Sequence, residues 1–316
     1  MKFNIMPAKE AFLGLKNTDC NYEQAEIVVI PFGLEKTVSY GNGTANAPEA
    51  IIKASHEVEL FDEELQYQTS DRMKIITLED TRSIQHLYKN TIKSQQAKSL
   101  ISNYNNNPLD YLSAIIKQTI HDNKLSLTFG GEHTISAAII KPLIQKHQEI
   151  TILHFDAHAD LRNAYNGDKF SHASAMRRCL DYDNVNLLSF GIRNISQEGM
   201  DFYKNNQHRI KIFWAYDKGN WNYELIKQYL TNKNIYLSFD VDSFDSSLMP
   251  ATGTPEPGGL FWDDVIKIIR LATQFSKIIA IDINELAPIA TLHSCDFCVA
   301  KLAYKILSLI QHYKKL

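Results

Sequence analysis

The chain has 316 residues, of which 44% are hydrophobic and 22% are charged, and its formal net charge is −3. This composition is typical of a protein with a large core, and without a basic excess we expect no nucleic-acid partner. The N-terminus lacks the apolar stretch of a secretion signal, and no apolar run approaches the ~18 residues of a membrane span, so we expect no membrane partner. Four scattered cysteines are too few for a disulfide framework, which favours a cytoplasmic location.

Short apolar runs alternate with helical patterns along the chain. Seven runs predict buried strands, at 27–30, 125–129, 150–155, 185–190, 210–215, 235–239 and 278–283. Their hydrophobicity is nearly continuous, as in strands that are covered on both faces. Apolar residues three and four apart predict helices that start at Pro108, Ile135, Trp262 and Cys298. The alternation predicts an α/β fold, a three-layer α/β/α sandwich with a mainly parallel, roughly eight-stranded sheet.

The polar segment 72–98 is expected to be a loop or a loosely packed helix. The sequence contains no repeat, low-complexity tract or linker, which favours a single domain. In open parallel sheets, ligands bind beyond the carboxyl ends of the strands, so polar residues at those ends are the first candidates for a site.

Polar clusters follow four of the predicted strands, namely GGEH at 130–133, DAHAD at 156–160, DVD at 240–242 and NE at 284–285. In an extended chain, residues two apart face the same way, so Asp156, His158 and Asp160 can point at one place, as can Asp240 and Asp242. The six candidate metal ligands are His133, Asp156, His158, Asp160, Asp240 and Asp242. A lone DxHxD pattern can be a turn or capping cluster, but four clusters at strand ends favour a metal site.

Crowded carboxylates repel one another and are costly to bury unpaired, and divalent cations resolve that conflict. An oxygen-rich set with two imidazoles suits manganese better than structural zinc, and four carboxylates are enough to bridge two ions. We therefore expect two Mn²⁺ ions per subunit.

The same clusters resemble motifs of the ureohydrolase family, which includes arginase, agmatinase, guanidinobutyrase and formimidoylglutamase. GGEHT at 130–134 resembles the family's GGDHS block, HFDAHADLR at 154–162 its DAHxD block, and SFDVDSFD at 238–245 its SxDxDxxDP block. Similar stretches at 38–51, 171–178, 251–260 and 282–288 extend the resemblance from about Ile27 to the end. It implies one ureohydrolase domain over 1–316, with 1–26 as an N-terminal extension. Glu132 and Ser246 depart from the usual aspartate and proline, and neither is a proposed ligand.

The resemblance also implies a role for each site residue. One manganese ion would be held by His133, Asp156, Asp160 and Asp240, and the other by Asp156, His158, Asp240 and Asp242. His172, within SHASAMRR, matches the family's proton-transfer histidine. Glu285, within NELAP, matches the glutamate that pairs with the guanidinium of the substrate.

These roles fit the chemistry of a guanidinium. Two metal ions that share one water lower the pKa of that water enough to supply hydroxide near neutral pH. Asp160 would accept a hydrogen bond from this hydroxide. Glu285 would hold the guanidinium by charge-assisted hydrogen bonds, and His172 would protonate the leaving amine as a general acid. The expected catalytic residues are therefore His172, Asp160 and Glu285, of which Glu285 and His172 also bind substrate.

The loop at 161–174 lacks the Asn/Thr/Ser-rich pattern that arginases use for the α-carboxylate and α-ammonium, and it resembles the agmatinase loop. This favours a small guanidino substrate, with agmatine first, giving putrescine and urea. Guanidinobutyrase, arginase, guanidinase and formimidoylglutamase stay open as alternatives. Outside the family, the alternatives are a single-zinc deacetylase, which has no use for both His133 and Asp242, and an inactive regulatory paralogue. The resemblance also implies a homo-oligomer, a trimer or a hexamer.

Two further features are expected to be structural. Cys295 and Cys298 form a CxxC without a second pair, which favours core packing over zinc or redox chemistry. Asp245 is expected to accept structural hydrogen bonds near the site instead of binding metal.

Overall fold

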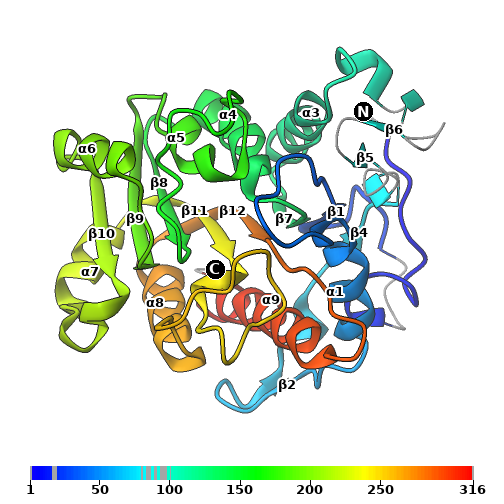
Figure 1. Cartoon of the computed structure of the whole chain (residues 1–316). Helices are drawn as coiled ribbons and strands as arrows, with labels where there is room; N and C mark the ends of the chain where they lie inside the picture. Colours follow the sequence, from blue (N-terminus) through cyan, green and yellow to red (C-terminus); the bar gives the residue numbers. More distant parts are fainter. Residues whose placement is uncertain are drawn as a thin grey trace.

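The computed structural model of the chain describes residues 2–15, 20–79, 81–82, 87–88, 91–92, 98–99 and 101–314. The centre of this described part is an eight-stranded parallel sheet in the order β10-β9-β8-β11-β12-β7-β1-β4 (Figure 1). Its strands are β1 (Ile27–Phe32), β4 (Ile75–Thr77), β7 (Leu125–Gly130), β8 (Ile150–Phe155), β9 (Val185–Ile192), β10 (Ile210–Trp214), β11 (Asn234–Asp240) and β12 (Lys277–Asn284). Two short antiparallel pairs lie outside it, β2 (Phe61–Asp62) with β3 (Tyr67–Gln68) and β5 (Leu87–Tyr88) with β6 (Thr91–Ile92).

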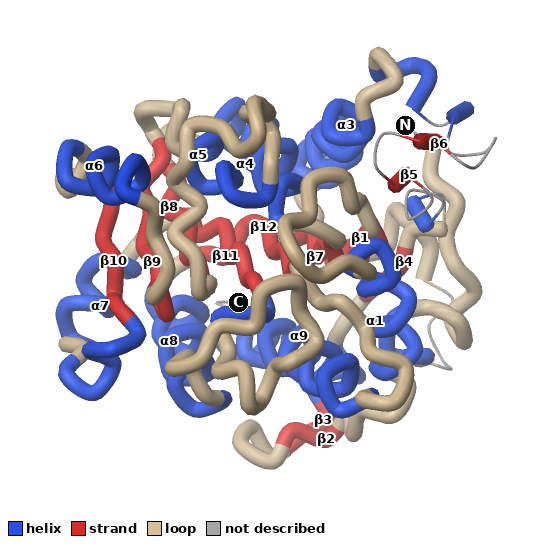
Figure 2. The backbone as a smooth tube through the Cα atoms, viewed as in Figure 1, coloured by secondary structure: helices blue, strands red, loops and turns tan. Residues whose placement is uncertain are grey.

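Helices cover both faces of the sheet (Figure 2). One face carries α3 (Pro108–His121), α4 (Ser136–Lys146), α5 (Ala175–Cys179) and α6 (Gln197–Asn205). The other carries α1 (Ala47–Ser55), α7 (Tyr223–Leu230), α8 (Trp262–Phe275) and α9 (His293–Tyr313). The predicted three-layer α/β/α sandwich with a parallel sheet is confirmed.

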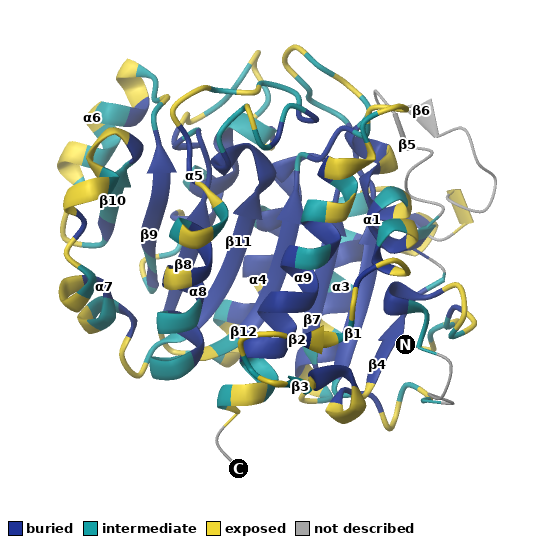
Figure 3. Ribbon diagram, turned by 90° about the horizontal axis from the view of Figure 1, so that it is seen from below, coloured by how far each residue is buried: buried dark blue, intermediate teal, exposed yellow. Residues whose placement is uncertain are grey.

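Every strand of the sheet except β7 supplies apolar side chains to both cores, and on one face β7 carries the buried Ser126 and Thr128 instead. Figure 3 shows the central strands as buried. In β1, Ile27 and Val29 belong to the core beneath α1 and α9, whereas Val28 and Ile30 belong to the core beneath α3 and α4. Successive side chains of a strand point to opposite faces, so a strand with helices on both faces must be apolar at every position. This explains why the strands appear in the sequence as unbroken apolar runs.

All seven predicted strands are present, but the expectation for 72–98 is wrong at Ile75–Thr77, which forms the edge strand β4. This strand pairs with β1 in register, with Ile27 opposite Ile75. The three residues, two isoleucines and a threonine, are too short a run to show a period, and it is the pairing with β1 that makes them a strand. Residues 80, 83–86, 89–90 and 93–97 of the same segment lie outside the described residues.

The described part of the N-terminal segment packs against the domain. Met6, Phe12 and Leu13 are buried in the core, and the ring centroid of Phe12 lies 5.1 Å from that of Phe129 in β7. The bounds of the N-terminal extension and the assembly into oligomers stay predictions. Among the helices of the described residues, none combines the length and the apolar character that a membrane span needs.

Two glycines at the end of β7 allow the loops above the sheet to approach closely. A β-carbon on Gly131 would lie 2.1 Å from the carbonyl oxygen of Leu34, which is a backbone atom that cannot rotate away. Gly131 also accepts a hydrogen bond from the backbone N–H of Glu285 at 2.8 Å. The glycine therefore joins the loop after β1 to the loop after β12, directly above the carboxyl edge of the sheet.

Substitution of Gly131 by alanine should destabilise the fold by about 3 kcal/mol, because overpacking against backbone forces the two loops apart. Gly219 is the matched control, since a β-carbon there would meet no atom within 4 Å. We expect Gly219→Ala to change stability by less than about 1 kcal/mol. Urea unfolding of both variants measures the difference, and equal midpoints would show that the close approach at Gly131 is unimportant.

Candidate metal centre and active site

The carboxyl ends of four adjacent strands, β8, β11, β12 and β7, meet at one edge of the sheet. His133 follows β7, Asp156 directly follows β8, Asp240 ends β11 and Glu285 directly follows β12. A cavity of about 190 Å³ lies at this edge. Its lining residues include His133, His158, Asp160, His172, Asp240, Asp242 and Glu285. With Asp156, which is 1% exposed, all the residues expected to form the site lie at this edge.

His133 is buried, and its Nδ1 atom faces three carboxylates. Nδ1 lies 3.2 Å from Asp156 Oδ2, 3.2 Å from Asp160 Oδ2 and 3.3 Å from Asp240 Oδ2. None of these contacts has the alignment of a hydrogen bond, so Nδ1 is a buried polar atom without a hydrogen-bond partner. Buried polar atoms are ordinarily paired. One imidazole nitrogen and three carboxylate oxygens around a single point form a donor set that fits a divalent cation.

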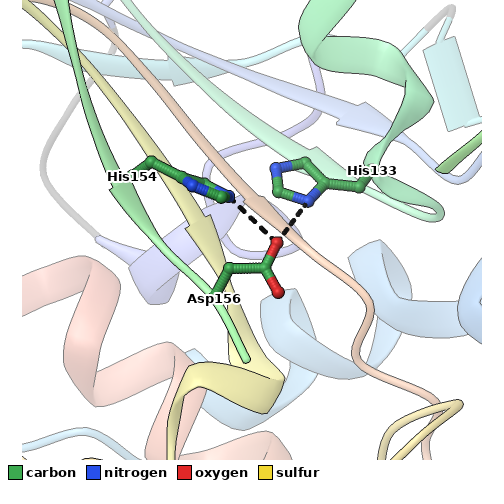
Figure 4. Close-up of side chains that lie close together, drawn as sticks. All are labelled: His133, His154 and Asp156. Atoms are coloured by element: carbon green, nitrogen blue, oxygen red, sulfur yellow. Dashed lines mark hydrogen bonds and ion pairs between the residues drawn. The ribbon is translucent and has the colours of Figure 1, made fainter. Parts of the chain in front are cut away.

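Asp156 belongs to two groups of side chains that could each hold a metal ion. The first is His133, His154 and Asp156 (Figure 4), and the second is Asp156, His158 and Asp242. Within each group the ligand atoms lie within 4.8 Å of one another. His158 Nδ1, for example, lies 2.9 Å from Asp242 Oδ2 and 3.5 Å from Asp156 Oδ1. A carboxylate common to two ligand groups is in the position of a bridging ligand.

The electrostatics of the cluster show how its charges compete. Burial, followed by the charges of Asp242 and Asp156, raises the pKa of Asp240 well above its ordinary value. Burial alone would also raise the pKa of Asp156, but the three imidazoles around it hold that pKa well below its usual range. Burial opposes the charged form of His158, yet the neighbouring carboxylates outweigh it and raise the pKa of His158 to about 12. Protons therefore stand in for the positive charge that divalent cations would supply.

A buried polar network behind His133 fixes its ring. His133 Nε2 lies 2.9 Å from Ser238 Oγ, and Ser238 Oγ donates to Asp282 Oδ1 at 2.9 Å. Asp282 is fully buried and also accepts hydrogen bonds from the hydroxyl groups of Ser136 and Tyr236. This chain of hydrogen bonds holds a proton of His133 on Nε2 and turns Nδ1 toward the carboxylates. Metal-binding histidines are oriented in this way by their second ring nitrogen.

Arg193 joins the segment that carries Asp242, a member of the second ligand group, to the loop at 256–257. Its Nη2 donates to the carbonyl oxygens of Asp242 at 2.7 Å, Phe244 at 3.1 Å and Glu256 at 2.8 Å. Its Nε donates to Pro257 O at 3.0 Å. One guanidinium therefore satisfies several loop carbonyls at once and fixes the backbone of Asp242 relative to the loop at 256–257.

The two predicted substrate-binding residues, Glu285 and His172, line the same cavity as most of the candidate metal ligands. Glu285 Oε1 accepts a hydrogen bond from the backbone N–H of His133 at 2.6 Å, which ties this carboxylate to the metal centre. Burial, and then the charge of Glu132, raises the pKa of Glu285 well above its ordinary value. His172 also lines the cavity, and its ring contacts the loop that follows β1.

Two of these residues have a backbone conformation that is unusual for any residue except glycine. Asp160 has φ 51° and Glu285 has φ 66°, both in the left-handed region. Non-glycine residues occupy this region at an energetic cost, and such residues concentrate at functional sites.

Sequence reasoning missed several residues around the site. His154 Nε2 lies 2.9 Å from Asp156 Oδ2, and the two-residue period that pointed to Asp156 and His158 would also have found it. The contacts of Arg193 are with backbone carbonyls, which no sequence pattern reveals. The two structural expectations are confirmed: Asp245 accepts from the N–H groups of Gly258 and Gly259 at 2.7 and 2.9 Å, and Cys295 is a core residue against which Cys298 packs.

Comparisons with known proteins agree with this geometry. The model of the arginase family matches residues 25–308. A curated relative, the N(1)-aminopropylagmatine ureohydrolase of Synechocystis, is 33% identical over 91% of this chain and 90% of its own length. The agmatinase of Bacillus anthracis is 27% identical over 85% of this chain and 86% of its own length. The crystal structure of the agmatine ureohydrolase of Thermoplasma volcanium has a TM-score of 0.77 at 24% identity, covering 96% of this chain and 95% of that one, and it shares the fold. The chain therefore belongs to the arginase family of ureohydrolases.

Proposed function

We propose that this chain hydrolyses agmatine, or a guanidine closely related to it, to urea and an amine at a centre of two Mn²⁺ ions. The observation that carries the proposal is the convergence of six ligand side chains, Glu285 and His172 at one cavity. Metal ligands alone would fit many hydrolases. A carboxylate for a guanidinium and an imidazole for proton transfer, set around the same ligands, favour guanidine hydrolysis.

The residues present fit a pair of divalent ions. His133 Nδ1 lacks a hydrogen-bond partner, and Asp156 is common to both ligand groups. His133, Asp156, Asp160 and Asp240 would hold one ion, and Asp156, His158, Asp240 and Asp242 the other. When bound, such a pair supplies ionised water near neutral pH. An oxygen-rich donor set of this kind favours manganese over zinc.

The remaining side chains would orient the substrate and move protons. Glu285 has one oxygen engaged by the backbone of His133, which fixes the carboxylate and leaves Oε2 for a guanidinium. A guanidinium would supply the positive charge that Glu285 needs in order to ionise in a buried position. His172 would provide the proton with which the amine leaves. Asp160 would orient the nucleophile.

Agmatine is the first choice of substrate because the loop at 161–174 resembles the agmatinase loop. A second candidate follows from the names of the relatives, since the curated protein at 33% identity is an N(1)-aminopropylagmatine ureohydrolase. The two compounds share the guanidinium and differ in an aminopropyl group at the other end. They would use the same catalytic residues and differ at the mouth of the cavity.

A substrate panel tests the proposal. Manganese-loaded protein should release equal amounts of urea and amine from agmatine, from N(1)-aminopropylagmatine, or from both, and far less from arginine, guanidinobutyrate, guanidine and formiminoglutamate. Comparison of kcat/KM between the first two compounds decides between the candidates. Urea from arginine alone would refute the substrate assignment.

Loss of Asp156 should abolish the response to manganese. Mn²⁺ at 100 times its Kd should stabilise the wild-type protein by about 2.7 kcal/mol, seen as a rise in Tm. Asp156→Asn should lose this rise, because both ligand groups lose their common carboxylate. The rise should grow with pH, since Mn²⁺ must displace the protons held by His158 and Asp240, whose pKa values are raised.

Asp245→Asn is the matched control for this measurement. Asp245 is a neighbouring carboxylate whose contacts are with Ser247, Gly258 and Gly259. Its loss should lower the Tm of the metal-free protein while keeping the rise on addition of Mn²⁺. A full rise in Asp156→Asn would remove the basis of the proposed metal centre.

Replacement of His172 by alanine should lower kcat by a factor of about 100 or more, as expected for the loss of a general acid. Manganese content and the Mn²⁺-dependent rise in Tm should stay at wild-type values, because His172 is not a proposed ligand. Metal analysis and steady-state kinetics on agmatine measure both. Wild-type turnover in His172→Ala would exclude the proton-transfer role.

A further inference from the structure

Both ring nitrogens of His172 contact hydroxyl groups from the loop that follows β1. Nδ1 lies 3.1 Å from Thr37 Oγ1, and Nε2 lies 2.6 Å from Ser39 Oγ. The backbone N–H of His172 also donates to Thr37 Oγ1 at 3.0 Å, and the ring stands edge-on to Tyr165 with 5.4 Å between centroids. The imidazole is therefore fixed on both sides, and a proton that leaves either nitrogen meets a hydroxyl first.

The loop that carries these hydroxyls is itself anchored to the metal centre. Glu132 is fully buried, and its Oε2 accepts hydrogen bonds from the backbone N–H groups of Lys36 at 2.6 Å and Thr37 at 2.5 Å. Glu132 directly precedes the metal ligand His133 in the chain. The Glu132 carboxylate thus holds the loop of Ser39 close to the proposed ions. Glu132 is also the position at which this sequence has glutamate in place of the more usual aspartate.

The two hydroxyls differ in their access to the cavity. Ser39 is exposed and lines the cavity together with Asp160 and Glu285. Thr37 is not among the residues that line it. His172 lines the same cavity, so Ser39 Oγ is both at the cavity wall and in contact with the Nε2 atom of His172.

We propose that Ser39 Oγ relays the proton between His172 Nε2 and the leaving nitrogen of the substrate. The proposal rests on the guanidine hydrolysis proposed above and adds a second residue to its proton path. A hydroxyl can accept one proton while it donates another, so a relay of this kind needs no change in the charge of the serine. Thr37 is a positioning residue, because it holds the backbone and the far nitrogen of His172.

The step balances without any additional reactant. The C–N bond of the tetrahedral intermediate breaks, and its electron pair stays on the nitrogen. That nitrogen takes the hydroxyl proton of Ser39, while protonated His172 gives its Nε2 proton to Ser39 Oγ. The amine leaves as a neutral molecule, Ser39 is again a hydroxyl, and His172 is neutral. The proton that the hydroxyl of the intermediate loses as urea forms passes to solvent.

A leaving group of low basicity separates a proton relay from a merely structural serine. The probe substrates are agmatine and 3-aminopropoxyguanidine, which releases a much less basic alkoxyamine that needs less protonation in order to leave. Ser39→Ala should lower kcat on agmatine by about 100-fold but on 3-aminopropoxyguanidine by less than about fivefold. Ser39→Thr retains the hydroxyl and should recover most of the agmatine rate.

Ser196→Ala is the matched control, because Ser196 lines the same cavity but its hydroxyl accepts from Gly199 N, at 3.1 Å, and caps α6. It should leave the ratio of the two rates at the wild-type value. Combining Ser39→Ala with His172→Ala should cost no more on agmatine than His172→Ala alone, since both residues serve one proton path. The Mn²⁺-dependent rise in Tm, measured on every variant, reports whether the metal centre is intact.

An equal loss on both substrates in Ser39→Ala, or an additive loss in the double variant, would overturn the relay and leave the hydrolysis itself standing. If the wild-type protein released urea from neither compound nor from any other guanidine tested, the proposed function would be wrong and the relay would fall with it.

Discussion

The structure depends on one constraint, the crowding of carboxylates at the carboxyl edge of the sheet. Asp156, Asp160 and Asp240 each bring an oxygen within 3.3 Å of one imidazole nitrogen. Three negative charges cannot share so small a buried volume at neutral pH without positive charge among them. The opposing pKa shifts of Asp156 and Asp240 are the sign of this conflict. The carboxylate cluster is therefore suited to bind cations. When no cation is bound, the rest of the fold must hold these carboxylates together.

The surrounding polar groups supply that support. Asp282 and Ser238 fix the ring of His133, and Arg193 fixes the backbone of Asp242. These groups lie on different strands and loops, so the ligand geometry is set by the sheet as a whole and not by one local motif. Side chains held in this way lose little freedom when metal binds, which favours tight binding.

Much of the fold and of the ligand set could be predicted from the sequence because both follow from local rules. Buried parallel strands are apolar throughout, and Asp156 and Asp240 stand where such runs end. The sequence could not reveal β4, whose three residues show no period, or the contacts of Arg193 with carbonyl oxygens. The contact of Ser39 with His172 joins residues that are 133 positions apart, and only the folded chain brings them together.

The left-handed backbone at Asp160 and Glu285 sets stability and chemistry against each other. Glycine would adopt φ 51° or 66° without penalty, and a side chain there costs on the order of 1 kcal/mol or more. A search for more thermostable variants would thus be drawn toward glycine at the two positions where the proposed hydrolysis needs a carboxylate. The strain is retained only while selection acts on turnover, so a relative that has glycine at either position would have given up activity for a more relaxed fold.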